Sequence, residues 1–141
     1  MRARLIVVLI SSFFFLGCGP EITVSNPLSV LNWSPHDGAA GIDVDAVPSV
    51  CLSLEIEEDS LEHAALRLGD SDVQGAPGTT DVPASIELSA VDSACIVFRP
   101  SASLAPGTTY HMVLEPGIRS SEKGGISLEV TLFSRFTTVD E

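Results

Sequence analysis

The stretch Leu104-Ala105-Pro106-Gly107-Thr108-Thr109-Tyr110-His111-Met112-Val113-Leu114 decides the fold of this chain. Pro106 and Gly107 form a tight turn, because proline fixes φ and glycine accepts a positive φ. The residues after Thr108 then alternate as a strand does, with Tyr110 on one face and His111 on the other. A tyrosine that follows such a turn can bury its ring and return its hydroxyl to a backbone group upstream. We therefore predict a strand whose entry is fixed by that hydrogen bond.

This arrangement is the tyrosine corner of Ig-like and fibronectin-like sandwiches. The rest of the chain agrees, because short alternating runs are separated by turns rich in glycine and proline. Strands are expected at 30–35, 49–56, 64–68, 82–89, 94–99, 109–114 and 126–138, with a turn-rich loop at 36–41, a short alternating piece at 42–45 and one helical turn around 57–63. The predicted fold class is all-β, an antiparallel β-sandwich of about seven strands.

Two local details accompany these strands. Asp59, with Glu62 three residues later, resembles a capping box at the start of the helical turn. Phe133 and Phe136 share a face of the last strand only if a bulge intervenes.

The composition is strongly acidic. The 141 residues carry 7 lysines and arginines against 19 aspartates and glutamates, a net charge of −12. Such a surface repels nucleic acid and anionic lipid headgroups, so no nucleic-acid partner is expected. Solubility is one reading of this charge. Cation binding is the other, at Asp43-Val44-Asp45 or Glu57-Glu58-Asp59, although neither resembles a calcium loop.

The first segment is typical of a bacterial export signal. Arg2 and Arg4 precede the apolar run Leu5–Leu16, which is too short to span a bilayer. It ends in Gly17-Cys18, which resembles a lipobox, where a small residue precedes the cysteine that is acylated. Phe15 departs from that pattern, because leucine is usual there. We expect residues 1–17 to be removed and Cys18 to carry a diacylglyceryl group, followed by a further acyl chain such as palmitate. A signal peptide cut nearby without acylation is the alternative.

Residues 18–28 then read as the lipidated N-terminus and a tether, and residues 29–139 as the domain. The tether contains Pro20 and Pro27 and shows little periodic hydrophobicity. Its last ten residues span at most about 33 Å. The chain would therefore be held close to a membrane by its lipid. Gly19 follows the cysteine, so the aspartate that retains enterobacterial lipoproteins in the inner membrane is absent, which favours the outer membrane, on its periplasmic or surface face.

The chain resembles the bacterial Ig-like domain of the SbsA type, first described in surface-layer proteins. The matching motifs run from Val30 to Thr138: Ser34-Pro35, Asp37-Gly38-Ala39, Gly41-Ile42, the alternating strand through Leu54, Phe98-Arg99-Pro100, the run Leu104–Tyr110 and Phe136-Thr137-Thr138. The loop after Gly117 departs from the family, because Ser120–Gly125 replaces its usual Asp and Gly-Asn. The resemblance implies a β-sandwich that serves as an extracytoplasmic spacer, adhesion or binding module, and it implies no reaction.

The remaining cysteines indicate a disulfide. Acylation of Cys18 leaves Cys51 and Cys95, and an exported chain meets an oxidising compartment. Both cysteines lie on the outward faces of their strands, and in sandwiches of this kind those strands pair side by side. A cross-strand bridge on the sheet surface is therefore predicted. Two free thiols are the alternative.

No catalytic, cofactor or metal motif stands out. The chain has no Gly-x-Ser-x-Gly elbow, no phosphate-binding glycine loop and no His-x-x-x-His or Cys-x-x-Cys spacing. The histidines His36, His63 and His111 are expected on the surface, and Trp33 in core or rim packing rather than as a sugar platform. We expect a non-catalytic, lipid-anchored envelope module with a structural or protein-interaction role, whose partner is an envelope protein or polysaccharide. The alternative is a small envelope protein whose loops hold a glycan or calcium ion.

Overall fold

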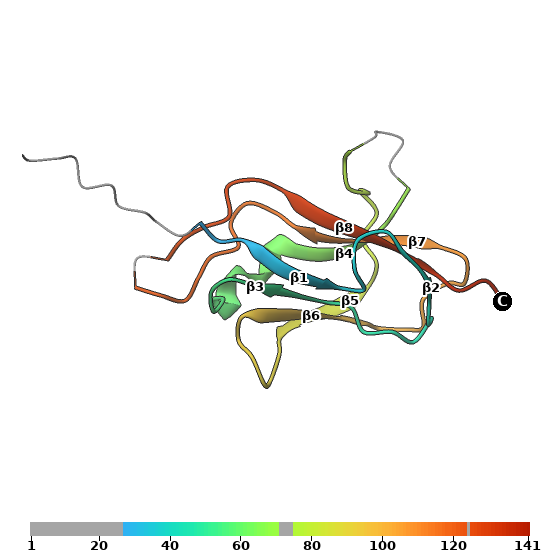
Figure 1. Ribbon diagram of the computed structural model, residues 1–141, viewed down its shortest axis with the longest axis horizontal. Coiled ribbons are helices and arrows are strands. Elements are labelled where there is room, and N and C mark those ends of the chain that lie inside the picture. The colour runs from blue at the N-terminus through green and yellow to red at the C-terminus, as the bar shows by residue number, and fades with distance from the viewer. Residues whose placement is uncertain (1–26, 71–74, 124) are drawn as a thin grey trace, which may run out of the picture.

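The structure is a computed structural model that describes residues 27–70, 75–123 and 125–141. These residues form eight strands and one short 3-10 helix, arranged as two packed sheets (Figure 1). The elements are β1 Val30–Ser34, β2 Ala39–Ile42, β3 Ser49–Leu52, η1 Glu58–His63, β4 Ala64–Leu68, β5 Ala84–Leu88, β6 Cys95–Pro100, β7 Thr109–Leu114 and β8 Leu132–Thr138. The all-β sandwich predicted from the sequence is therefore confirmed.

Each sheet has four strands. Sheet A has the order β1-β3-β6-β5, and sheet B has the order β2-β8-β7-β4. All neighbours are antiparallel except β2 and β8, which run parallel. Because successive side chains on a strand point to opposite faces, each sheet turns one set of residues toward the other sheet and one set outward.

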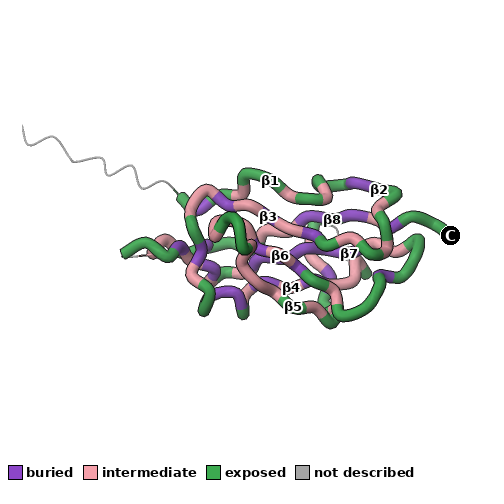
Figure 2. Tube along the Cα trace, turned by 90° about the horizontal axis from the view of Figure 1, so that it is seen from below, coloured by how far each residue is buried: buried purple, intermediate pink, exposed green. Residues whose placement is uncertain are grey.

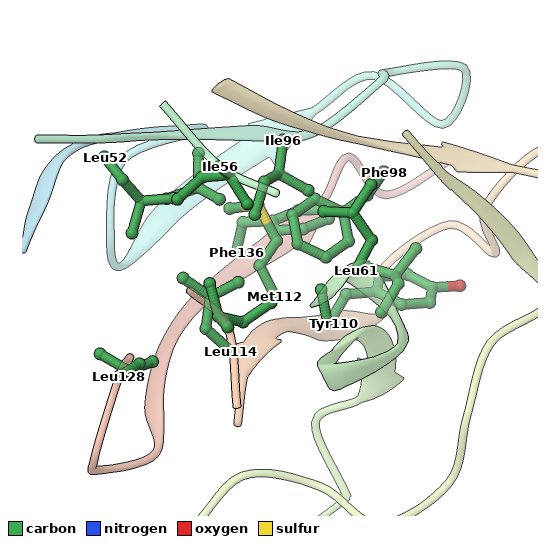
Figure 3. Close-up of a cluster of buried hydrophobic side chains, with 14 of the residues drawn as sticks. Leu52, Ile56, Leu61, Ile96, Phe98, Tyr110, Met112, Leu114, Leu128 and Phe136 are labelled. Atoms are coloured by element: carbon green, nitrogen blue, oxygen red, sulfur yellow. The ribbon is translucent and has the colours of Figure 1, made fainter. Parts of the chain in front are cut away.

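The core lies between the sheets. Sheet A supplies Val50, Leu52, Ile96 and Phe98, and sheet B supplies Leu66, Tyr110, Met112, Leu114 and Phe136. All of these side chains belong to one cluster with Leu61 of η1 and Leu128, and Figure 3 labels all of them except Val50 and Leu66. Leu28 is also buried against this cluster, so the packed part of the domain begins at the last residue of the expected tether.

Several strand boundaries differ from the prediction. β2 lies mostly within the loop expected at 36–41. Only Ile42 of the alternating piece expected at 42–45 belongs to this strand. β3 ends at Leu52, although Ile56 is buried, because Ile56 forms an isolated bridge with Ser120 instead of continuing the sheet. β8 begins only at Leu132, since the preceding segment pairs with Arg119 rather than with β7.

Of two local predictions, the capping box is wrong, and the expectation that Phe133 and Phe136 lie on opposite faces without a bulge is confirmed. The helical turn exists as η1, but its N-cap is Glu57 and no side chain caps it, so Asp59 and Glu62 form no capping box. Phe133 and Phe136 do not share a face, because the register of β7 with β8 is continuous from Thr109 to Leu114 and contains no bulge. Phe136 is fully buried in the core, and Phe133 lies on the outer face of sheet B.

Candidate functional site

The Tyr110 ring is buried at the entry to β7. The backbone N–H of Ala105 donates to the Tyr110 hydroxyl at 2.8 Å, which is the corner expected from the sequence. Gly107 has a φ of 59° and donates from its N–H to the carbonyl of Val139, so the turn and the end of β8 are tied together. The ring stacks on Phe136 with 5.7 Å between centroids. Pro106, Gly107 and Tyr110 therefore have a structural role, which is to fix the turn that leads into β7.

The disulfide joins two strands of sheet A. Cys51 of β3 lies directly opposite Cys95 of β6, with 4.0 Å between the Cα atoms. Both residues are half-buried on the outer face of the sheet. The bridge closes a loop between positions 44 residues apart, and it links neighbouring strands rather than the two sheets. Cys18, the expected lipidation site, lies outside the described residues.

His111 departs from the prediction that all three histidines lie on the surface. It does occupy the outer face of sheet B, but it is only 4% exposed. The N–H of Gly78 donates to its Nδ1 at 2.9 Å, and Phe133 packs beside the ring at 5.1 Å between centroids. A loop segment, which we call the strap (Gly75 to Asp81), therefore covers this histidine.

Close backbone contacts hold the strap in place. The N–H of Leu68 donates to the Thr80 carbonyl at 2.9 Å, and the N–H of Val82 donates to the Leu66 carbonyl at 2.8 Å. A Cβ at Gly78 would stand 1.7 Å from the Leu68 carbonyl oxygen, so only glycine fits there. The Pro77-Gly78 pair marks a turn in the sequence, but nothing local indicates that this turn reaches His111.

The environment of His111 favours the neutral imidazole. Burial lowers the pKa of His111, and the charge of Arg135 acts in the same direction, whereas Asp70 and Asp37 oppose them. Since Nδ1 accepts from Gly78, the neutral ring carries its proton on Nε2. The neutral imidazole thus accepts the hydrogen bond that ties the strap to sheet B.

The other two histidines lie elsewhere. His36 is exposed in the loop before β2, and His63 ends η1, where its ring packs on Gly117. A Cβ at Gly117 would lie 2.6 Å from that ring, and its φ of 118° also favours glycine. Within the described ranges, no group of three or more His, Cys, Asp or Glu side chains converges as a metal site would require.

Three carboxylates of the two acidic segments singled out in the sequence make local contacts, whereas Glu58 and Asp59 are exposed. The Asp43 carboxylate accepts from the N–H of Asp45 at 2.8 Å, and Asp45 bonds to the Ser103 hydroxyl. Glu57 pairs with Arg119, and this hydrogen bond lowers the pKa of Glu57. These carboxylates fix loops to one another.

Trp33 lies on the inner side of β1, opposite Val50 of β3. It is half-buried and packs against the core, as the sequence predicted. In the part of the chain that the structure covers, no helix is long and apolar enough to cross a membrane.

The comparisons with known proteins agree with this geometry. The profile of the bacterial Ig-like domain family matches residues 24–138. The chain belongs to this family. Bacterial Ig-like domains are generally non-catalytic modules. No curated protein matches the chain.

Two solved structures show the same fold. The surface-layer protein SbsC is 16% identical with a TM-score of 0.53, over 80% of this chain but 14% of that protein. The copper resistance protein PcoC from Escherichia coli is 17% identical with a TM-score of 0.55, over 78% of this chain and 98% of that protein. This bacterial Ig-like chain thus spans about one seventh of the SbsC structure that it resembles.

Proposed function

We propose that the protein is a non-catalytic, lipid-anchored Ig-like module of the bacterial cell envelope that supports or binds another envelope component. The observation that carries this proposal is the apolar segment that ends in Leu16-Gly17-Cys18, which the tether and the domain follow. Two or three acyl chains on one cysteine anchor a protein stably, because each buried methylene contributes about 0.8 kcal/mol. Gly19 at the next position favours the outer membrane.

The geometry of the domain fits such an anchor. The described chain starts at one end of the sandwich, and Glu141 lies at the opposite end (Figure 1). A lipid on Cys18 would therefore hold the first end near the bilayer and leave the loops of the far end most accessible. The match to the bacterial Ig-like family and the likeness to a surface-layer protein support an envelope role for this module.

Substitution of the cysteine tests the anchor. The Cys18→Ala protein should remain an unprocessed precursor, and it should lack the mass of the acyl groups. A matched tether variant, Ser25→Ala, should be processed and should sediment with membranes like the wild type. A Cys18→Ala protein with the wild-type mature mass would contradict the proposal.

A loop-bound calcium ion is the second candidate from the sequence, and a separate measurement addresses it. A ligand that binds only the folded state must raise the melting temperature as its concentration rises. We expect no rise in the melting temperature when calcium is titrated, since Asp43 and Glu57 make internal contacts and no three acidic side chains converge among the described residues. A rise that saturates would favour the binding-protein alternative.

A further inference from the structure

The two sheets present four outer strands, and three of them are poorly suited to pairing with another chain. β1 has an irregular register near Asn32, and β2 is short with a shifting register against β8. The edge of β4 is covered, because the backbone of Leu66 and Leu68 bonds to the strap and to Val82. Bulges, short strands and covering loops are the usual protections of sheet edges. β5 is the outer strand without such protection.

The register of β5 with β6 is continuous over its whole length. The N–H of Ser101 bonds to the Pro83 carbonyl, and the N–H of Ser89 bonds to the Cys95 carbonyl. Antiparallel pairs alternate between bonded and non-bonded positions. The N–H and C=O groups of Ala84, Ile86 and Leu88 therefore point away from β6, and no other residue in the described ranges bonds to them.

An apolar groove lies beside this free edge. β4 and β5, the neighbouring outer strands of the two sheets, lie side by side along one margin of the molecule (Figure 2). The groove has a volume of about 330 Å³ and is lined by Ala64, Ala65, Leu66, Asp81, Val82, Pro83, Ala84 and Ile86. Every other side chain of an added strand would face this apolar surface.

The charges around the groove select a basic occupant. Arg67 already pairs with Asp81 and Glu115, and Arg99 pairs with Glu87. Three exposed acidic side chains belong to η1, which packs against β5: Glu58, Asp59 and Glu62. A second copy of this strongly acidic chain would bring like charges together, whereas a lysine-rich or arginine-rich strand would be attracted.

We propose that the free edge of β5 and the adjoining groove bind an extended, basic segment of a partner polypeptide as an added strand. The backbone groups of Ala84, Ile86 and Leu88 would form the ladder, and the carboxylates of η1 would attract the charge. Main-chain hydrogen bonds give affinity in this mode, and alternate side-chain positions give specificity. The inference deepens the proposed function, because it names the surface through which an anchored module would bind its partner.

Two synthetic decapeptides test the proposal with the purified protein. One alternates valine and lysine and can extend a sheet. The other alternates proline and lysine, so it carries the same charge but its prolines lack the N–H groups that a ladder needs. We expect the valine peptide to shift the NMR signals of Ala84, Ile86 and Leu88 and to slow the hydrogen exchange of their amides. Equal binding of both peptides, or shifts spread evenly over the acidic surface, would overturn the proposal.

Charge reversal provides a matched pair of variants. Glu58→Lys with Glu62→Lys should weaken binding of the valine peptide by roughly tenfold, because each change replaces an attraction by a repulsion at an exposed site. Asp140→Lys with Glu141→Lys changes the net charge equally at the exposed C-terminal end of the chain, away from η1 (Figure 1), and should leave the affinity nearly unchanged. Equal losses of affinity in both variants would contradict binding at β5. Concentration-dependent self-association of the protein through β5, in the absence of peptide, would also contradict it. Neither measurement depends on the lipid, so a failed anchor and a failed binding edge remain distinguishable.

Discussion

Sheet B has buried side chains on both its inner and its outer face, but different contacts bury them. On the inner face, Tyr110 and Met112 pack against the opposite sheet. On the outer face, His111 is covered by the strap, and Val113 is fully buried between Ala65 and Phe133 in the same row. The inner face is thus specified by alternation along β7, whereas the outer face depends on a loop more than thirty residues earlier. Alternation predicts which face a residue occupies, but it does not predict exposure.

The largest expected effect lies on the inner face. Tyr110→Ala leaves a cavity in the core and should lower the free energy of unfolding by about 3–5 kcal/mol. Tyr110→Phe keeps the ring and removes only the acceptor for the Ala105 N–H, so it should cost about 1 kcal/mol, and up to about 3 if the donor stays unpaired. Urea denaturation measures both values. A phenylalanine variant as stable as the wild type would show that the corner hydrogen bond contributes nothing.

Truncating a valine on the outer face sharpens the comparison. Val113→Ala should cost about 2 kcal/mol, because the residue is fully buried although it lies outside the main core. Val97 is the matched control, since it lies on the outer face of sheet A and is half-buried. Val97→Ala should cost less than about 1 kcal/mol. Equal losses, measured by urea denaturation, would mean that the two outer faces do not differ.

Acidic pH should weaken the contact between His111 and the strap on the outer face of sheet B. The neutral imidazole is favoured in the folded state, so the pKa of His111 is lower there than in the unfolded chain. Its contribution is therefore complete above about pH 6.5 and is lost as the pH falls through the folded-state pKa. Loss of the bond to Gly78 should cost about 1 kcal/mol.

The control for this pH effect is His111→Gln, which removes the titrating group. We expect the difference in unfolding free energy between the wild type and this variant to shrink between pH 7 and pH 5. Carboxylates titrate in both proteins, so their effect cancels. A difference that stays constant with pH would contradict the assigned role of the imidazole.

The smallest expected effect is that of Ser134→Ala, which we compare with a change at a second buried serine, Ser60. The Ser134 hydroxyl faces the core and has no hydrogen-bond partner among the described residues. Ser134→Ala should leave stability unchanged or raise it by up to about 1 kcal/mol, because an unpaired polar group is removed. In contrast, the Ser60 hydroxyl donates to the Glu57 carbonyl and accepts from the Arg119 N–H. Ser60→Ala should therefore cost about 1–2 kcal/mol, and thermal unfolding that ranks the two variants in reverse would refute this account.

Local signals explain what the sequence could predict. The turn at Pro106 and Gly107 and the alternation after it lie within one short stretch, so the position of Tyr110 follows from them. Cys51 and Cys95 sit in clear alternating runs, and only their pairing needed knowledge of the fold. The sandwich class and most strand positions could be predicted for the same reason.

Pairing between distant segments explains what the sequence could not predict. β2 contains Gly41 and pairs in parallel with the last strand, so no local turn in the sequence predicts it. Ile56 and Leu128 continue the apolar pattern of their strands but are buried by the segment around Ile118. The strap on His111 and the free edge of β5 likewise follow from the order of the strands, which alternation does not encode.

We propose that the three cysteines serve two roles, with Cys18 as the lipid anchor and Cys51 and Cys95 as the cross-strand bridge. The most direct test is the mass of the protein from membranes, after alkylation under denaturing, non-reducing conditions. The account predicts a chain that begins at Cys18, carries diacylglyceryl and acyl groups on that residue, and gains no alkyl group at Cys51 or Cys95. A chain without lipid, or with two alkylated cysteines, would contradict it.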